Sequence, residues 1–129
     1  MPRQELPRPT AGELAILRVL WGHGPGTVRE IWERLEGPRP VGYTTVLKLL
    51  QIMAGKGLVA RDDRRQSHVY SAARSEEQTQ RVLVRDLLDR AFGGSAQKLV
   101  LRALDSRKVS PQELAEIRNV LDQLEGGAK

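Results

Sequence analysis

The chain contains no cysteine and only two histidines among its 129 residues. Without cysteine there can be no disulfide, no thiolate metal cluster and no thiol nucleophile. A zinc site would have to add carboxylates to His23 and His68, and His23 stands in a glycine-rich turn without neighbouring ligand residues. We therefore expect this protein to bind no metal.

Long apolar runs are also missing. No stretch approaches the roughly 20 apolar residues that a membrane helix needs, and the segment from Met1 to Glu5 lacks the apolar core of a secretion signal. No acid pair, activated nucleophile or metal cluster is visible, so neither catalysis nor a cofactor is expected. These absences predict a cytoplasmic protein that is not an enzyme and has no membrane partner.

Positive charge is present in excess, and its distribution is uneven. Lysine and arginine number 21 against 16 aspartates and glutamates. Residues 1–74 hold 12 basic and 7 acidic side chains, whereas residues 75–129 hold 9 of each. A general preference for arginine would be expected to produce an excess of positive charge in the second half of the chain as well. The distribution favours nucleic-acid binding by the first half.

Helix boundaries are well marked in this first half. Residues 1–9 contain three prolines and two arginines, which favours an extended arm. The sequences Thr10-Ala-Gly-Glu13 and Thr27-Val-Arg-Glu30 both have the spacing of a capping box, so two amphipathic helices are expected to begin there. A third should start after Gly42 and end at Gly57, which can adopt the left-handed conformation of a helix stop.

The expected third helix has two different faces. At helical spacing, one side is apolar and the other is small, polar or cationic, as a helix entering the DNA major groove requires. The apolar side consists of Val46, Leu49, Leu50 and Met53, and the polar side of Thr44, Lys48, Gln51 and Gly55.

A basic hairpin is expected directly after this helix, with strands at residues 58–61 and 68–71. Three helices followed by a hairpin predict a mainly α fold, a winged helix-turn-helix domain over residues 10–74. The remaining residues, 75–129, are expected to form three amphipathic helices, which would make a small core alone and so predict a two-fold homodimer. The apolar residues assigned to the dimer interface are Leu87, Leu88, Phe92, Leu99, Val100, Leu104, Leu114, Ile117 and Leu121.

The winged-helix reading assigns DNA contacts to named residues. The first turns of a recognition helix enter the groove first, which favours base contacts there, although a solvated helix face would look the same. The base contacts are assigned to Thr44, Thr45, Lys48 and Gln51. Backbone contacts from the start of the second and third helices and from the wing are assigned to Thr27, Arg29, Tyr43, Arg64, Arg65, Ser67 and His68.

Several short segments occur together along nearly the whole chain: Trp21, Thr27-Val-Arg-Glu-Ile31, Tyr43-Thr-Thr-Val46, Lys56-Gly-Leu-Val59, Phe92-Gly-Gly-Ser95, Ser110-Pro-Gln-Glu-Leu114 and Ile117-Arg118. Taken together, they resemble the BlaI/MecI penicillinase repressors, in a group that includes copper-responsive repressors. The resemblance implies a homodimeric winged-helix repressor that binds pseudo-palindromic double-stranded operator DNA and blocks transcription.

Two features of that group differ here. The penicillinase repressors are cleaved at an Asn-Phe bond, and the resemblance places a candidate regulatory cleavage position at Arg102-Ala103 of this chain, where the residues differ. The regulatory protease or sensor is therefore unknown. Copper sensing through a Cys-x-Cys pair is excluded because the chain has no cysteine. The alternatives are a winged-helix scaffold that binds protein, or an architectural protein that binds DNA without sequence preference.

Overall fold

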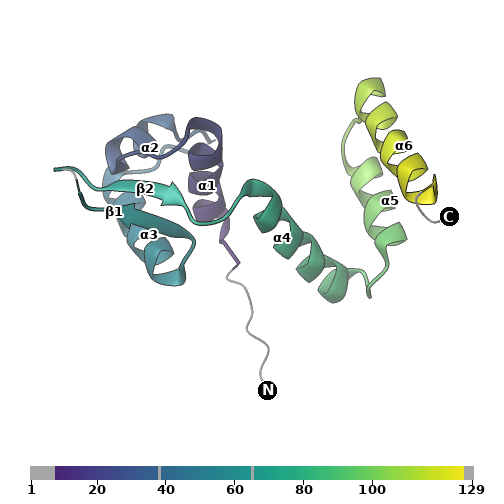
Figure 1. Cartoon of the computed structure of the whole chain (residues 1–129), viewed down its shortest axis with the longest axis horizontal. Coiled ribbons are helices and arrows are strands. Elements are labelled where there is room, and N and C mark those ends of the chain that lie inside the picture. Colours follow the sequence, from purple (N-terminus) through teal and green to yellow (C-terminus); the bar gives the residue numbers. More distant parts are fainter. Residues whose placement is uncertain (1–7, 38, 65, 127–129) are drawn as a thin grey trace, which may run out of the picture. The chain divides into compact units, whose positions relative to one another are not determined.

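The computed structural model describes residues 8–37, 39–64 and 66–126. Three helices come first, α1 (Ala11–His23), α2 (Val28–Arg34) and α3 (Tyr43–Lys56), and the hairpin β1 (Val59–Asp62) and β2 (Val69–Ala72) follows (Figure 1). This is the winged helix-turn-helix order predicted from the sequence. Of the expected arm at residues 1–9, all but the last two residues lie outside the described part.

Both predicted capping boxes are present. The Thr10 N–H donates to Glu13 Oε1 at 2.9 Å, and the Glu13 N–H donates to Thr10 Oγ1 at 3.3 Å. Thr27 and Glu30 make the same reciprocal pair at 2.9 and 3.2 Å. The side chains thus satisfy amide groups that the first turn of a helix leaves without partners.

Gly57 ends α3 in the left-handed conformation, with a φ of 79°. Its N–H donates to Ala54 O at 3.2 Å, and the Leu58 N–H donates to Met53 O at 2.9 Å, which together form a Schellman motif. Leu58 and Met53 are both buried in the core. The chain therefore leaves the helix in a fixed direction and enters β1 at the next residue.

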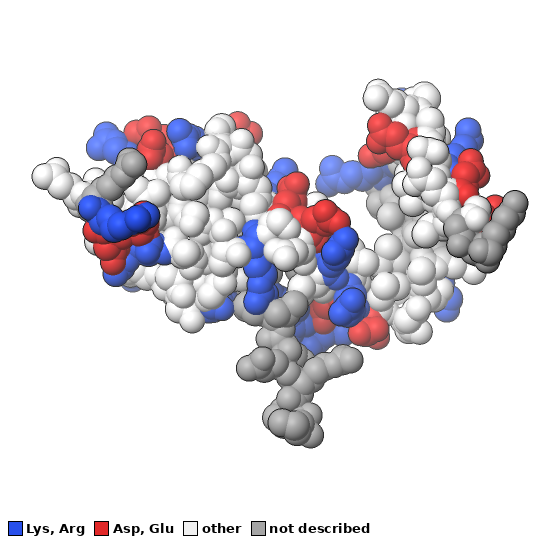
Figure 2. Space-filling view, in the orientation of Figure 1, with Lys and Arg blue, Asp and Glu red and all other residues white. Residues whose placement is uncertain are grey.

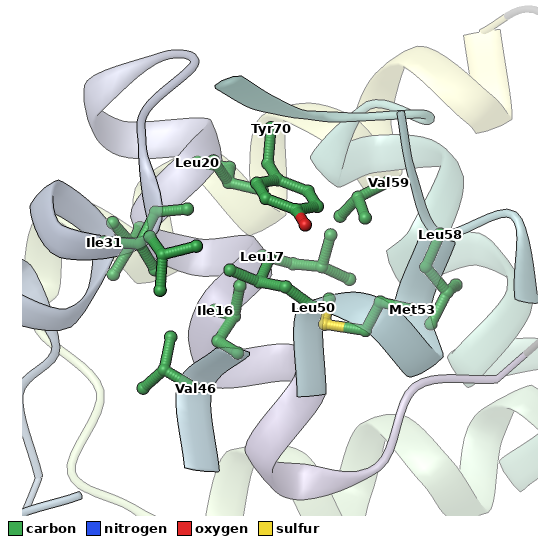
Figure 3. Close-up of a cluster of buried hydrophobic side chains, with 12 residues drawn as sticks. Ile16, Leu17, Leu20, Ile31, Val46, Leu50, Met53, Leu58, Val59 and Tyr70 are labelled. Atoms are coloured by element: carbon green, nitrogen blue, oxygen red, sulfur yellow. The ribbon is translucent and has the colours of Figure 1, made fainter. Parts of the chain in front are cut away.

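The core of this unit draws on every element of the winged helix (Figure 3). The side chains with no exposed surface come from the three helices, and Tyr70 of β2 covers them with only 1% of its surface exposed. Burial of this apolar surface is the main stabilising contribution to the domain. The fully buried residues are Ile16 on α1, Ile31 on α2, and Val46, Leu50 and Met53 on α3.

The hairpin is antiparallel, with Val59 opposite Ala72 and Asp62 opposite Val69. Its strands begin and end one residue later than predicted. One additional pairing has no counterpart in the expected elements: the Gly26 N–H donates to Tyr70 O at 3.0 Å, and the Tyr70 N–H donates to Gly26 O at 2.8 Å. This bridge joins the residue before the cap of α2 to the second strand of the wing.

The chain divides into two compact units, one ending at Arg85 and the other beginning at Asp86. The division falls inside α4 (Glu76–Ala91), whereas the sequence-based boundary was placed between residues 74 and 75. Thr79, in the second turn of this helix, is buried with 7% of its surface exposed. The first part of α4 is therefore packed as part of the winged-helix unit.

Two further helices complete the second unit, α5 (Ala96–Ser106) and α6 (Pro111–Gly126). Gly93 and Gly94 separate α4 from α5 with φ values of 55° and 80°, and Ser95 and Ser110 accept hydrogen bonds as helix caps. Among the described residues from Asp86 onward, none is buried. Within the described ranges, no helix is both long and apolar enough to cross a membrane.

Candidate nucleic-acid interface

The two faces of α3 are separated largely as predicted, although Leu49 of the expected apolar face is only partly buried. Val46, Leu50 and Met53 have no exposed surface, whereas Thr44, Thr45, Lys48 and Gln51 are all exposed. No hydrogen bond or ion pair engages these four side chains within the described part of the chain. Their donors, acceptors and one positive charge are therefore available to a ligand along a single helix face.

The C-terminal end of α3 is attached to the start of α1 by an ion pair. Lys56 Nζ lies 3.0 Å from both Oε1 and Oε2 of Glu13, a side chain with only 2% of its surface exposed. Burial disfavours the charged form of Glu13, but the hydrogen bond from the Thr10 N–H and the contact with Lys56 outweigh it. The pKa of this carboxyl is consequently lower than its ordinary value of 4.5.

The N-terminal end of α3 contacts Trp32 of α2. The indole Nε1 donates to Val41 O at 2.7 Å, and the indole meets the Tyr43 ring edge to face with 5.8 Å between ring centroids. Trp32 itself has 37% of its surface exposed. Ile31 occupies the buried position of α2, and the next residue in a helix points about 100° away from it.

The wing carries basic residues that are matched by two aspartates. Arg64 donates from Nε and Nη2 to the two carboxylate oxygens of Asp62, at 3.0 and 2.9 Å. Asp63 accepts from Arg61 and lies 2.7 Å from His68 Nδ1. The pKa values of Arg61 and Arg64 are raised, chiefly by the hydrogen bonds to Asp63 and Asp62 respectively.

Acidic and basic side chains are accordingly mixed around the hairpin loop (Figure 2). Arg64, Ser67 and His68, three of the four wing residues assigned to backbone contacts, are exposed. Arg65, the fourth, lies outside the described residues. Within the described part of the wing, Arg61 and Arg64 are therefore both paired with carboxylates.

At the start of α2, the side chains assigned to phosphate contacts are also bonded to groups within the protein. Thr27 Oγ1 accepts the Glu30 N–H in its capping box, which occupies one of its lone pairs. Arg29 Nε donates to Glu33 at 3.1 Å, and the Arg29 side chain is 76% exposed. The geometry leaves Arg29 able to exchange an exposed carboxylate for a phosphate, since exposed ion pairs are weak.

The Arg102-Ala103 bond lies inside α5. Both residues are exposed, Arg102 pairs with Asp105 at 3.3 Å, and the Ala103 carbonyl accepts from Ser106 Oγ at 3.1 Å. A protease binds its substrate in an extended conformation, so this turn of α5 would have to unfold before cleavage. Alignment with the cleaved bond of the penicillinase repressors therefore does not by itself make the Arg102-Ala103 bond a favourable protease site.

Three helices, a wing and an unpaired polar face on the third helix define the class, a winged-helix DNA-binding regulator of transcription. The profile of the family described as penicillinase repressor matches residues 9–123. The chain belongs to the penicillinase repressor family. That family consists of transcriptional repressors and not of enzymes.

Individual relatives cover most of the chain. The chain is 34% identical to the transcriptional regulator BlaI of Mycobacterium tuberculosis over 119 residues, which are 89% of this chain and 83% of the relative. It is 20% identical to a penicillinase repressor of Staphylococcus aureus, covering 87% and 89% of the two chains. With a penicillinase repressor of Bacillus licheniformis, the identity is 22% and the coverage 93% and 94%.

Solved structures give more distant likenesses. The YusO protein of Bacillus subtilis aligns with a TM-score of 0.48 and 22% identity, covering 91% of this chain and 74% of that one. The structure of Staphylococcus aureus MarR in complex with salicylate and kanamycin aligns with a TM-score of 0.48 and 23% identity, covering 91% and 71%.

Proposed function

We propose that this protein is a sequence-specific repressor that binds a pseudo-palindromic operator as a homodimer and blocks transcription by occupying promoter DNA. The observation that carries the proposal is the exposed face of α3. The side chains of Thr44, Thr45, Lys48 and Gln51 are exposed and have no internal partners among the described residues, although Ile52 of the same helix is also 52% exposed. On the opposite face Val46, Leu50 and Met53 have no exposed surface. A helix with these two faces can enter the major groove without giving up any of its packing.

Base recognition is assigned to the first three turns of α3. Lys48 can donate to the O6 and N7 acceptors of guanine, which is among the commonest specific contacts in the major groove. The methyl groups of Thr44 and Thr45 can meet the methyl group of thymine. Gln51, one turn beyond Lys48 and two turns beyond Thr44, can pair with adenine or contact a phosphate.

Backbone contacts would fix the position of α3 on the duplex. Tyr43 is 44% exposed at the start of α3, where its hydroxyl can reach a phosphate. Arg29 and the wing residues Arg64 and His68 would have to leave their carboxylate partners to do the same. These contacts would make affinity depend on salt, because phosphate neutralisation releases counterions from DNA.

Dimerisation is assigned to the second unit. Apolar side chains on all three of its helices remain uncovered: Leu87, Val100 and Leu121 expose 48%, 44% and 53% of their surfaces. A second copy of the chain would cover these faces with a matching set, as in the two-fold interfaces that most homodimers use. The full proposed interface comprises Leu87, Leu88, Phe92, Leu99, Val100, Leu104, Leu114, Ile117 and Leu121.

Two alternatives remain distinct from this proposal. A winged-helix scaffold for protein binding would favour an apolar or acidic outer face on α3, and the threonines and Lys48 argue against it. An architectural protein would bind DNA equally well whatever its sequence. A sequence-specific repressor contacts base edges and an architectural protein does not, so the two differ in their relative affinity for operator and shuffled DNA.

The decisive experiment is a fluorescence-anisotropy titration of the protein against DNA from upstream of its own gene and against a shuffled control, at several salt concentrations. Tight, salt-sensitive binding that strongly favours the upstream DNA is the expected result. Equal affinity for both duplexes would indicate an architectural protein. A folded protein that binds neither would shift attention to a protein partner.

A further inference from the structure

One side chain of α2 holds both sides of the residue at which α3 begins. Trp32 Nε1 donates to the carbonyl of Val41, and the Trp32 ring packs against Tyr43 with an interplanar angle of 86°. These two residues flank Gly42, the N-cap of α3. Trp32 therefore contacts the chain immediately before and immediately after the cap.

This cap differs from those of the other helices. The helices α1, α2, α4, α5 and α6 each begin with a threonine or serine hydroxyl that accepts a backbone N–H. Gly42 has no side chain and makes no such bond. A side-chain cap normally helps to fix where a helix starts. At the start of α3, the contacts of Trp32 with Val41 and Tyr43 fix the beginning of the helix in place of a side-chain cap.

We propose that Trp32 is a positioning residue for DNA recognition. By holding Val41 and Tyr43, it sets the direction in which the first turn of α3 presents Thr44 and Thr45 to the bases. This inference rests on the proposed function. Base-edge hydrogen bonds require close alignment, whereas phosphate contacts from long side chains tolerate small shifts. Loss of Trp32 should therefore affect sequence preference more than general DNA affinity.

The chain contains its own matched control. Trp21 is the second of the two tryptophans, and its Nε1 also donates to a backbone carbonyl, that of Arg74 at 3.0 Å. Trp21 packs against the core and does not flank the cap of α3. The substitutions Trp32→Phe and Trp21→Phe each remove one indole N–H donor and keep an aromatic ring, but only the first loosens the start of α3.

The test compares both variants with the wild type in the anisotropy titration against operator and shuffled DNA. Trp32→Phe should weaken operator binding about five- to tenfold and leave shuffled-DNA binding and the salt dependence nearly unchanged. Trp21→Phe should preserve the ratio of the two affinities, although it lowers the unfolding temperature more because Trp21 is the more buried ring. Circular dichroism confirms that each variant is folded.

A spectroscopic measurement keeps the proposal testable even if Trp32→Phe does not fold. In the Trp21→Phe protein, Trp32 is the sole indole, and operator DNA should change its emission more than shuffled DNA does. The same emission change with both duplexes would overturn the inference, as would a Trp32→Phe protein whose affinity ratio stays within about twofold of the wild type. A wild-type protein with no preference for its operator would instead overturn the proposed function, and this inference with it.

Discussion

Lys56 and Glu13, 43 positions apart in the sequence, join the last turn of α3 to the first turn of α1 through two contacts of 3.0 Å. Glu13 also accepts the Thr10 N–H that begins α1. One buried carboxylate thus completes a helix cap and anchors the proposed recognition helix. The remaining end of α3 is held separately by Trp32.

Replacing Glu13 with Gln should lower the free energy of unfolding at neutral pH by about 1 to 3 kcal/mol, because a hydrogen-bonded charge is lost from a buried site. The pKa of Glu13 is lower in the folded protein than its ordinary 4.5, so between the two values the unfolded chain binds more protons. The Glu13 contribution is therefore complete above that ordinary value and is lost as the pH falls through the folded value.

Urea unfolding of wild type and Glu13→Gln from neutral to acidic pH measures this effect. The two stabilities should converge as the pH falls. The exposed Glu36 provides a control, since Glu36→Gln should leave the curve unchanged. A constant difference between wild type and Glu13→Gln at every pH would contradict the assigned role of the carboxylate charge.

Replacing Lys48 with Ala should cost about 1 to 3 kcal/mol of binding free energy on the operator and less on shuffled DNA, because a base contact is lost. The control is Lys98→Ala, which removes an exposed lysine from α5. Anisotropy titrations of both variants measure the two losses. Equal losses on both duplexes would reassign Lys48 to a phosphate.

Replacing Asp63 with Asn should increase affinity for operator and shuffled DNA alike and steepen the salt dependence. The substitution removes a negative charge from the wing and frees Arg61, whose Nε lies 2.8 Å from the carboxylate. Asp89→Asn changes the net charge equally but in the second unit, outside the winged-helix domain, and should have little effect. If both variants bind more tightly to the same extent, net charge and not the wing controls affinity.

Replacing Leu121 with Arg should yield a monomer that binds operator DNA poorly, because a charge on a 53% exposed leucine would be buried between two copies. Gln123→Arg adds the same charge on another face of α6 and should leave the dimer intact. Light scattering coupled to size-exclusion chromatography measures the masses. An unchanged mass for Leu121→Arg would remove this residue from the interface. The companion substitution Leu104→Arg probes α5 in the same way.

Replacing Gly57 with Ala should lower the unfolding free energy by about 1 to 2 kcal/mol, because a side chain is strained at a φ of 79°. Gly55 is two residues earlier, within α3, and a Cβ there would meet nothing within 4 Å. Gly55→Ala should stabilise the protein by about 0.5 to 1 kcal/mol. Thermal unfolding of the two variants checks the opposite signs.

Helix boundaries were predictable because their signals are local. Thr10, Thr27 and Gly57 act through residues three to five positions away, so the sequence alone shows both partners. The separation of the α3 faces was predictable for a related reason. Burial of Val46, Leu50 and Met53 on one side follows from the helical repeat.

Other features depend on how distant segments meet. The apolar spacing of α2 does not show how much of this helix α3 covers, so the 37% exposure of Trp32 was not predictable from the sequence. The bridge between Gly26 and Tyr70 is a single pairing of distant residues, which leaves no periodic pattern. On the wing, the geometry of the hairpin decides that Asp62 pairs with Arg64 and that Asp63 pairs with Arg61 and His68.

The two faces of α3 share no residue, and this has a consequence for the descent of related repressors. Substitutions at Thr44, Lys48 or Gln51 alter no buried contact, so they can accumulate without loss of stability. Duplicated copies of such a gene could therefore acquire new target sites in a few steps, while Val46, Leu50 and Met53 continue to preserve the scaffold. Separate regulatory circuits could arise from one ancestral domain in this way.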